Sequence, residues 1–357
     1  MKLAYLASAG SIHTARWANA MAARGHEVAV LTAHDPSPDS PLHPGVALHR
    51  LPVPPPGGYF LNAPRIRRVL RSIRPDVLHV HYASGYGTLG RLSGFQPTIL
   101  SVWGSDITEF ARNSPIRRYL LKKNLKYPEL LCATSEFLRR ETEKLVMPRN
   151  PIVVTPFGVD CQIFRPRQSD AHANEFVVGT VKTLSEGYGI DRLLEAFALF
   201  QQAATRAIKL KLRIVGGGPD RRELERKAHR LGIAHLTEFT GPVPADAVPN
   251  LLAGFSVYVA LSRIESFGLA VLEASAAGIP AIVSDAGGLS EVVADGVTGV
   301  VIPDGSPRLA SDAMIRLLRD PDERRRMGVA GRRFVSNNFP IDKTIVTMEE
   351  VYQSITS

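Results

Sequence analysis

A strand, a loop and a helix follow one another in residues 256–278, which read SVYVALSRIESFGLAVLEASAAG. The apolar run 256–260 predicts a buried strand. After the loop, the pattern predicts a helix that begins near Phe267 and runs to Ala277, because Gly278 is a typical helix terminator. Strands that alternate with helices in this way are typical of a parallel sheet covered by helices on both faces.

The same alternation runs along the whole chain in two successive series. The first series predicts short strands at residues 3–7, 27–32, 47–51, 76–81, 98–102, 130–134 and 152–155. The second series predicts strands at residues 175–181, 210–215, 236–240, 256–260, 280–283 and 299–302. We therefore expect an α/β protein with two doubly wound, parallel-sheet domains of the Rossmann type.

The domain boundaries follow from where the series restarts. We place an N-terminal domain at residues 1–165, a C-terminal domain at 166–338, and a final helix at 339–357 that packs back towards the N-terminal domain. The boundary falls within residues 164–173, and a length of 357 residues agrees with two domains of roughly 150 residues. Open α/β sheets bind ligands outside the carboxyl ends of their strands, so we expect the two domains to face a central cleft that holds the site.

Basic residues are concentrated in the N-terminal half. The formal net charge is +9; residues 1–165 hold 21 Lys and Arg against 11 Asp and Glu, whereas residues 166–357 hold 22 against 23. Much of the excess lies on two predicted amphipathic helices, around residues 65–74 and 117–126, and we expect Asn62 to cap the first. These helices are interpreted either as solvated faces or as a surface that docks onto an anionic membrane. Nucleic acid is not expected, since no recognition helix, zinc finger or RNP motif is present.

Cysteine content and hydropathy favour a cytoplasmic protein. Cys132 and Cys161 cannot form a disulfide framework, which indicates a reducing compartment. Residues 1–6 are interpreted as a strand and not as a signal peptide. No stretch reaches the roughly 18 apolar residues of a membrane-spanning helix. Any membrane association is therefore expected to be peripheral, on the inner face of the plasma membrane.

The strongest chemical signal surrounds Gly268. Amides in the first turn of a helix have no partners inside the helix, so those of Phe267, Gly268 and Leu269 can bind an anion such as a diphosphate. Glycine also allows that anion to approach the backbone closely. Glu265 can reach sugar hydroxyls from the loop, and Glu273 can accept hydrogen bonds from a diol such as a ribose. An alternative interpretation of Glu273 is a helix charge with a basic neighbour.

Further motifs accompany the two glutamates, which have seven residues between them. They are EASAAGIP at 273–280, Gly287-Gly288 with Glu291, TPFGVD at 155–160 with FRP at 164–166, SIHTARWAN at 11–19, RGHEV at 24–28, PDVLHVHY at 75–82 and SVWGSD at 101–106. Together these motifs resemble the retaining GT-B glycosyltransferases of family 4, a bacterial glycosyltransferase group 1. The resemblance covers nearly the whole chain, and the glutamate motif in its strand–helix context is its most specific part.

The resemblance implies transfer of a sugar, with retention, from a nucleotide sugar that is expected to be UDP-linked, without a metal or other cofactor. The C-terminal domain would bind the donor, and the N-terminal domain would bind a lipid-linked or cell-surface glycan acceptor. By the same resemblance Glu265 is a catalytic residue that contacts the donor sugar, and Glu273 contacts the ribose. The donor phosphates would lie against residues of three segments, namely Gly10 and Ser11, Lys182, and Ser266, Phe267, Gly268 and Leu269. For Gly10 an ordinary turn is an equal alternative.

The chain departs from this family at two positions. Relatives usually place two basic residues under the diphosphate, five positions apart; Lys182 fits the first, but Gly187 occupies the second. Arg263 or Arg192 are candidates to replace the missing cation, whose loss weakens stabilisation of the leaving group. The second departure is Trp103, where many relatives have His. An aromatic ring there suits either stacking on a sugar or burial in the core.

Three side chains are candidates for proton transfer or charge stabilisation at the reacting centre. His13 follows the first strand, and His81 and Asp106 lie at or just after the ends of later strands. A histidine there can take a proton from an acceptor hydroxyl. The alternatives are a hydrogen-bonded structural histidine in each case and, for Asp106, capping of the next helix. Retaining transfer does not require any of them as a base.

Other enzyme classes are disfavoured, while three functions of this fold stay open. Residues 216–218 are Gly-Gly-Gly but lack the G-x-G-x-x-G pattern, and the sequence has no P-loop, H-E-x-x-H or C-x-x-C motif. The favoured function is a retaining glycosyltransferase. A UDP-sugar 2-epimerase of the same fold and a catalytically weak sugar-nucleotide binding protein, which Gly187 suggests, are the alternatives.

Overall fold

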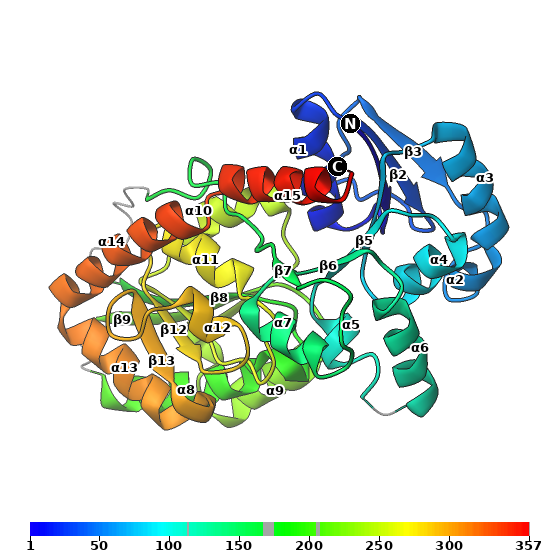
Figure 1. The fold of residues 1–357 in the computed structure, drawn as a ribbon. Coiled ribbons are helices and arrows are strands. Elements are labelled where there is room, and N and C mark those ends of the chain that lie inside the picture. Colours follow the sequence, from blue (N-terminus) through cyan, green and yellow to red (C-terminus); the bar gives the residue numbers. More distant parts are fainter. Residues whose placement is uncertain (113, 167–174, 205–207, 357) are drawn as a thin grey trace. The chain divides into compact units, whose positions relative to one another are not determined.

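A computed structural model describes residues 1–112, 114–166, 175–204 and 208–356 (Figure 1). The chain divides into two compact units, one of Met1–Pro156 with Asp342–Ser357 and the other of Phe157–Ile341. Most of residues 164–173, where the sequence predicts the domain boundary, lies outside the described residues.

A seven-stranded parallel sheet forms the centre of the first unit, in the order β3-β2-β1-β4-β5-β6-β7. Its strands are β1 (Lys2–Leu6), β2 (Glu27–Thr32), β3 (Val46–Arg50), β4 (Val77–His81), β5 (Thr98–Val102), β6 (Leu130–Ala133) and β7 (Val153–Val154). β1 pairs in parallel with both β2 and β4, so the winding direction reverses between β1 and β4. This reversal makes the carboxyl ends of β1 and β4 the switch point at which doubly wound sheets bind ligands.

Short helices connect these strands. They are α1 (Ile12–Ala23), α2 (Gly58–Leu61), α3 (Ala63–Ile73), α4 (Gly85–Ser93), α5 (Ser105–Thr108), α6 (Pro115–Leu125) and α7 (Glu136–Glu143), with α15 (Ile341–Thr356) at the end of the chain. α3 buries Ile66, Val69 and Leu70, as expected of an amphipathic helix. The predicted cap is wrong, because Asn62 has helical dihedrals and its side chain bonds the N–H and the carbonyl of Val53 instead.

The C-terminal helix α15 completes a buried polar chain in the first unit. Tyr352 is fully buried, and its hydroxyl lies 2.8 Å from the hydroxyl of Tyr5 on β1 and 2.8 Å from Nδ1 of His79 on β4. The other nitrogen of His79 is bonded to Ser101 Oγ on β5 at 2.7 Å. Three strands are thus tied to a helix that is more than 200 residues away in sequence.

In the second unit a six-stranded parallel sheet has the order β10-β9-β8-β11-β12-β13. Its strands are β8 (Glu175–Val181), β9 (Lys209–Val215), β10 (Thr237–Gly241), β11 (Val257–Ala260), β12 (Ala281–Ser284) and β13 (Gly299–Ile302). The helices are α8 (Ile190–Ala203), α9 (Arg221–Arg230), α10 (Val248–Leu252), α11 (Leu269–Ala276), α12 (Leu289–Val292), α13 (Pro307–Arg319) and α14 (Pro321–Asn338). Here the winding reverses between β8 and β11.

The predicted fold class is confirmed, because both sheets are parallel and doubly wound. Several strands, among them β2, β5, β8 and β13, have the predicted bounds. The predicted strand at 152–155 is reduced to the two residues of β7. Within the described part of the chain, no helix is long and apolar enough to cross a membrane.

Candidate active site

A buried ion pair occupies the switch point of the second unit. Lys182 directly follows β8, and Glu265 lies in the loop after β11, the neighbouring strand. The Lys182 ammonium donates to the Glu265 carboxylate, and the side chains are only 10% and 12% exposed. Parallel pairing of β8 and β11 therefore brings together two predicted site residues that are 83 positions apart.

Lys182 is held in its charged form. Burial alone lowers the pKa of Lys182, but the adjacent Glu265 carboxylate outweighs burial and keeps that pKa above its usual value. The ammonium also lies over the ring of Tyr188, 4.9 Å from the ring centroid, which adds a cation–π contact. The site thus combines a permanent cation with a carboxylate that can accept hydrogen bonds from sugar hydroxyls.

Gly268 sets the start of α11, and the helix begins at Leu269, two residues later than predicted. Gly268 has φ 99° and ψ 39°, a left-handed conformation that ends the loop before the helix can begin. A Cβ at Gly268 would also lie 2.9 Å from Leu289 Cδ2. The first turn of α11 therefore begins at Leu269, and in this turn the N–H of Val271 already donates to the carbonyl of Gly268 at 3.0 Å.

The loop before α11 is fixed by backbone contacts. The N–H of Gly288 donates to the carbonyl of Glu265 at 2.9 Å, and a Cβ at Gly288 would lie 2.5 Å from the carbonyl oxygen of Ser266. Phe267 is 4% exposed and packs against Phe339, with ring centroids 5.8 Å apart. Phe267 can therefore meet a ligand only through its backbone.

The second unit thus carries the predicted donor-binding residues of the C-terminal domain on two strand ends and one helix. Glu273 is half-buried in the second turn of α11, the helix that Gly268 and Leu269 begin. Among the described residues, no group of three or more His, Cys, Asp or Glu side chains could hold a metal ion.

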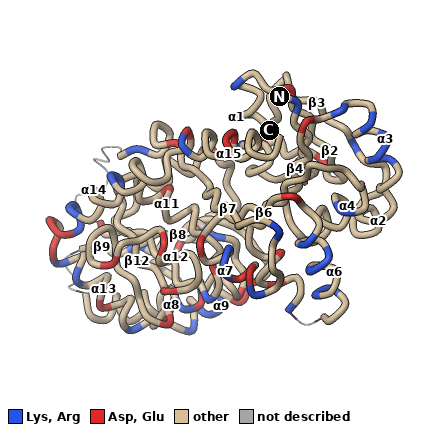
Figure 2. Tube along the Cα trace, viewed as in Figure 1, with Lys and Arg blue, Asp and Glu red and all other residues tan. Residues whose placement is uncertain are grey.

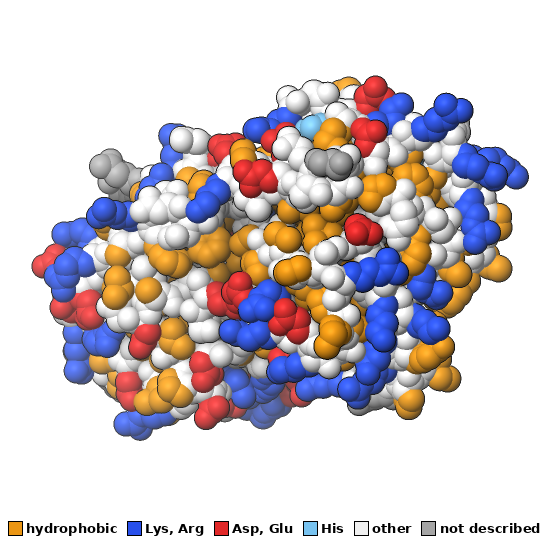
Figure 3. Space-filling view, viewed as in Figure 1, with side chains coloured by type: hydrophobic (Ala, Val, Ile, Leu, Met, Phe, Trp, Pro, Cys, Tyr) orange, Lys and Arg blue, Asp and Glu red, His pale blue; other side chains and the backbone are white. Residues whose placement is uncertain are grey.

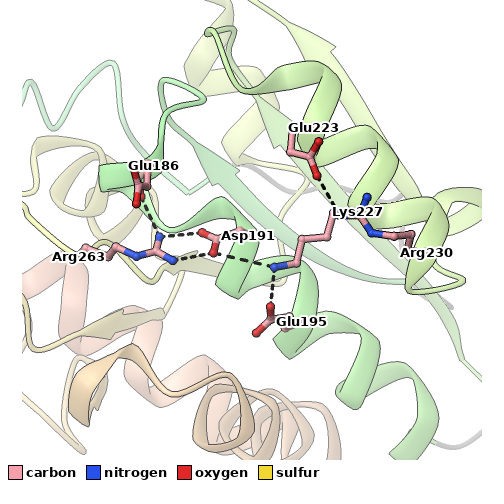
Figure 4. A network of polar contacts seen from close by, with 7 residues as sticks. All are labelled: Glu186, Asp191, Glu195, Glu223, Lys227, Arg230 and Arg263. Atoms are coloured by element: carbon pink, nitrogen blue, oxygen red, sulfur yellow. Dashed lines mark hydrogen bonds and ion pairs between the residues drawn. The ribbon is translucent and has the colours of Figure 1, made fainter.

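Arg263, a candidate for the missing second cation, is engaged elsewhere. Its guanidinium donates to both carboxylate oxygens of Asp191, at 2.8 and 2.6 Å, and to the carbonyl of Glu186 at 2.8 Å (Figure 4). The Arg263 N–H donates to the carbonyl of Gly187 at 2.8 Å. Arg263 therefore fixes the loop that contains Gly187, which argues against it as the replacement. Arg192, the other candidate, lies beside Gly305: one of its guanidinium nitrogens is 2.7 Å from the position that a Cβ on Gly305 would occupy.

In the first unit, Gly10 and Ser11 form the turn between β1 and α1. Gly10 is exposed, and a Cβ there would lie 3.0 Å from the carbonyl oxygen of Asp35. Ser11 is the N-terminal cap residue of α1, but its side chain makes no capping hydrogen bond. Its hydroxyl is therefore not needed to start the helix.

Of the two predicted histidines, His81 is buried and His13 is half-buried, and both are neutral at neutral pH. His81, at the end of β4, is 1% exposed, and its Nδ1 is hydrogen-bonded to Thr14 Oγ1 at 3.3 Å. Burial, together with nearby His79 and His13, lowers the pKa of His81 well below its usual value. Burial and Arg16 lower the pKa of His13 to about 4. Both imidazoles are thus weak bases at neutral pH, and a catalytic role for His81 stays a prediction.

Asp106 has a structural explanation. It is 1% exposed, and its carboxylate accepts from the N–H groups of Ala83 at 2.8 Å, Gly104 at 2.8 Å and Trp103 at 3.2 Å. Burial raises the pKa of Asp106, and these hydrogen bonds oppose that shift. Asp106 lies in the first turn of α5, so it fixes the loops after β4 and β5 and does not cap α5. Its predicted catalytic role stays a prediction.

Sequence reasoning missed the aromatic residues beside both switch points. Tyr188 lies under Lys182, and Tyr59 and Tyr86 line the same cavity as Trp103 and His81 in the first unit. The only sequence signal for Tyr188 is its place next to Gly187, and Tyr59 and Tyr86 have none.

Comparison with known proteins places the chain in a family. Residues 162–334 match the family described as "Glycosyl transferases group 1", and residues 2–135 match "Glycosyl transferase 4-like". A Mycobacterium tuberculosis protein named GDP-mannose-dependent alpha-(1-6)-phosphatidylinositol dimannoside mannosyltransferase is 31% identical, over 85% of this chain and 82% of that protein. The chain belongs to the group 1 glycosyltransferases. The predicted resemblance and the enzyme class are thereby confirmed.

Two solved structures similar to this glycosyltransferase agree in fold, and one further relative is similar in sequence. The N-acetyl-alpha-D-glucosaminyl L-malate synthase of Bacillus anthracis is 27% identical over 94% of this chain and 91% of that protein. A sucrose-phosphate synthase from Thermosynechococcus elongatus has a TM-score of 0.86 at 22% identity, over 99% of this chain and 98% of that one. Anabaena HepE has a TM-score of 0.82 at 20% identity, over 99% and 100% of the two chains. The fold is therefore GT-B.

Proposed function

We propose that this glycosyltransferase moves a sugar, with retention, from a UDP-linked donor to a lipid-linked or cell-surface glycan. The observation that carries the proposal is the Lys182–Glu265 pair at the switch point between β8 and β11, beside the start of α11 at Gly268. A cation and a helix N-terminus stabilise the charge that develops on a leaving diphosphate. The Glu265 carboxylate can bind the donor sugar, and Glu273 can bind the ribose.

The names of similar proteins support this donor class without fixing the base. HepE structures are titled as complexes with UDP and with UDP-glucose, whereas the mycobacterial relatives are named for GDP-mannose and phosphatidylinositol mannosides. A thermal-shift screen of UDP-, GDP-, ADP- and dTDP-sugars tests the choice, because a ligand that binds the native state raises its midpoint. Stabilisation by UDP-sugars supports the proposal, and stabilisation by another nucleotide sugar alone contradicts the UDP assignment.

Turnover of the Glu265→Ala variant tests the site. We expect transfer and donor hydrolysis to fall by orders of magnitude, while the stereochemistry of the wild-type product, read by NMR, shows retention. Near-normal turnover of the Glu265→Ala variant would contradict the assignment of this site.

The two alternative functions give different results. UDP binding without turnover across many acceptors favours the weak binding protein that Gly187 suggests. Formation of a manno product from UDP-GlcNAc alone favours an epimerase. The proposal requires no metal, so activity in the presence of EDTA is expected to persist.

An anionic membrane is the proposed location of the acceptor, with the enzyme on the cytoplasmic side. Figure 2 shows Lys and Arg along α3 and α6 of the first unit, and Figure 3 shows hydrophobic side chains among basic ones on this face. Ile116 and Tyr119 on α6 are 74% and 60% exposed, and Phe60 and Leu61 on α2 are 50% and 67% exposed. Apolar side chains among cations are typical of interfacial binding, to which each basic residue adds about 1 kcal/mol.

Liposome flotation tests the membrane proposal. Arg65, Arg67, Arg68 and Arg71 are all exposed, but Arg67 also donates to the carbonyl of Leu92 at 2.7 and 3.1 Å and so has a structural role. The triple change of Arg65, Arg68 and Arg71 to Glu is therefore expected to abolish binding to anionic vesicles without unfolding α3. Unchanged flotation would exclude α3 as the contact.

A further inference from the structure

A cavity of about 460 Å³ lies at the amino edge of the second sheet. It is lined by residues 253–256 before β11, by residues 278–280 before β12, and by Pro321, Arg324 and Arg325 in the first turns of α14. β11 and β12 are parallel, so their amino ends share one edge, whereas Glu265 follows the carboxyl end of β11. The four residues of β11 alone separate the two edges by about 13 Å. The cavity is therefore distinct from the candidate active site.

Arginines provide the charged side chains of this cavity. Among the described residues that line it, Arg324 and Arg325 are basic and none is Asp or Glu. The Arg324 guanidinium lies over the ring of Phe176, 5.2 Å from the ring centroid, and donates to the carbonyl of Leu317 at 2.8 Å. These two contacts hold the guanidinium in place, but neither supplies a negative charge.

Arg324 is a half-buried cation that has no carboxylate partner within the described part of the chain. Burial and the nearby charge of Arg325 both lower the pKa of Arg324, although an arginine remains protonated at neutral pH. Charges that are removed from water are normally paired with an opposite charge. An anion in the cavity would provide that missing partner and would reduce the repulsion between the two arginines.

Arg325 is free enough to bind the same anion. One of its guanidinium nitrogens lies 3.2 Å from a carboxylate oxygen of Asp322, and the two side chains are 76% and 74% exposed. Exposed pairs of this kind contribute little to stability, so an anion can compete for the guanidinium. Glu323, the other acidic residue in the first turn of α14, is paired with Arg316 at 3.4 Å.

The wall beside the arginines is a fixed backbone surface. A Cβ on Gly328 of α14 would clash with the carbonyl oxygen of Gly278, so the helix and the loop after α11 touch through their backbones. Arg332, on the same helix, donates to the carbonyl of Ala276 at the end of α11. α14 is thereby held against this loop without a ligand, and a preorganised site loses little free energy to ordering when it binds.

We propose that this cavity binds a small soluble phosphate compound, either inorganic phosphate or a phosphate monoester, through the guanidinium groups of Arg324 and Arg325. A phosphate monoester carries about 1.5 to 2 negative charges at neutral pH, and the planar fork of an arginine matches its oxygens. The inference goes beyond the proposed function, because the donor diphosphate is assigned to the opposite edge of the sheet.

The size and the apolar lining of the cavity favour a soluble compound. The volume lies within the roughly 300–1,000 Å³ of small-molecule sites, so it leaves room for the group that a monoester carries. Phe255 and Ile279 are the large apolar side chains of the lining, and they are only 7% and 6% exposed. Side chains this buried do not insert into a bilayer, which disfavours the headgroup of a membrane lipid as the ligand.

The test compares glycerol 3-phosphate with glycerol, because the two compounds differ by one phosphate group. Saturation-transfer NMR on the full chain measures the binding of each compound at constant ionic strength, since salt screens the exposed arginine. Glycerol 3-phosphate is expected to bind at least about tenfold more tightly than glycerol. Equal binding of the two compounds, or no binding of glycerol 3-phosphate, overturns the proposal.

Variants of the two arginines locate the binding in this cavity, because a phosphate can also bind beside Lys182. Arg325→Gln, at an exposed position, and Arg324→Lys, which keeps the charge but loses the planar fork, are each expected to weaken glycerol 3-phosphate about tenfold. Arg333→Gln, at an exposed position on α14 outside the cavity, is the matched control and should leave binding unchanged. Equal effects of Arg325→Gln and Arg333→Gln overturn the proposal.

A final measurement separates a soluble phosphate from a lipid phosphate. Vesicles that contain phosphatidic acid present the same phosphate monoester on a bilayer. Equal flotation of the wild type and of Arg325→Gln, together with binding of glycerol 3-phosphate that depends on Arg325, supports the proposal. Flotation that is lost in Arg325→Gln, without binding of glycerol 3-phosphate, overturns it.

Discussion

The ion pair between Lys182 and Glu265 predicts strong energetic coupling in a double-mutant cycle. Removal of one partner from a buried pair leaves an uncompensated charge, which typically costs about 3–5 kcal/mol. Both side chains are nearly buried, at 10% and 12% exposure, so little solvent screening reduces this figure. We expect Lys182→Met and Glu265→Gln each to destabilise the second unit by about 3 kcal/mol. The double variant, which buries no unpaired charge, should be no less stable than either single variant.

Urea unfolding of the full chain provides the assay, and the tryptophans provide an internal control. Trp17 and Trp103 are the two tryptophans of the chain, and both belong to the first unit. The unfolding midpoint read by their fluorescence should be the same in all variants. The midpoint read by far-UV circular dichroism, to which the second unit contributes, should shift to a lower urea concentration in the single variants. Glu223→Gln breaks an exposed pair with Arg226 and serves as the matched control, for which no shift is expected.

The sign of the pH dependence follows from the same pair. The pKa of Lys182 is raised in the folded state, so its contribution to stability is complete below the unfolded lysine pKa of about 10.4 and is lost as the pH rises above it.

Additive effects of the two single changes on the free energy of unfolding would refute the coupling, because independent residues add within about 0.5 kcal/mol. Loss of activity alone would not distinguish the pair from two separate binding contacts, so the stability cycle decides.

Three further outcomes are expected. Gly187→Arg, at a site where a Cβ meets nothing within 4 Å, should raise kcat about tenfold or more by restoring a second cation. The rate of UDP release measures this turnover, and an unchanged rate would contradict the prediction. Gly268→Ala should weaken UDP binding in calorimetry, because Gly268 has φ 99° and a Cβ there approaches Leu289; Gly187→Ala is the control. The pKa values of His13 and His79 are lowered to about 4 and about 3, so tryptophan-monitored stability should be constant above pH ~6.5 and fall below it, by up to about 1.4 kcal/mol per pH unit for each histidine. A constant midpoint between pH 7 and pH 5 would contradict the last prediction.

The parts of the fold that depend on local sequence could be predicted. β8 has its predicted bounds because a run of apolar residues between polar ends is itself the signal for a buried strand. The predicted start of α11 is two residues early, because Gly268 has a left-handed conformation and the regular helix begins only after it. Asn62 has a side chain suited to capping, but the nearby backbone of Val53 takes up its hydrogen bonds.

Side-chain partners at the site could not be predicted, because the partners are far apart in sequence and only the folded sheet brings them together. Lys182 and Glu265 were each predicted as ligand contacts, yet their contact with one another follows from the strand order of the folded sheet. The sequence makes Arg263 a candidate for the second cation, but only the structure shows that its guanidinium is bonded to Asp191, 72 residues away. Depth of burial was equally hidden: the position of His81 at a strand end was predicted, but its 1% exposure was not.

The two switch points therefore share a topology but differ in charge. Each sheet reverses its winding next to its first strand, at β1 and β4 in one unit and at β8 and β11 in the other. The second unit places a permanent cation and a helix N-terminus at this point, which suits a diphosphate. The first unit places neutral imidazoles, hydroxyls and aromatic rings there, although its exterior carries the excess of basic residues. The described residues that line the cavity of His81 and Trp103 include no Lys or Arg, so the excess of basic residues on the first unit lies elsewhere on its surface.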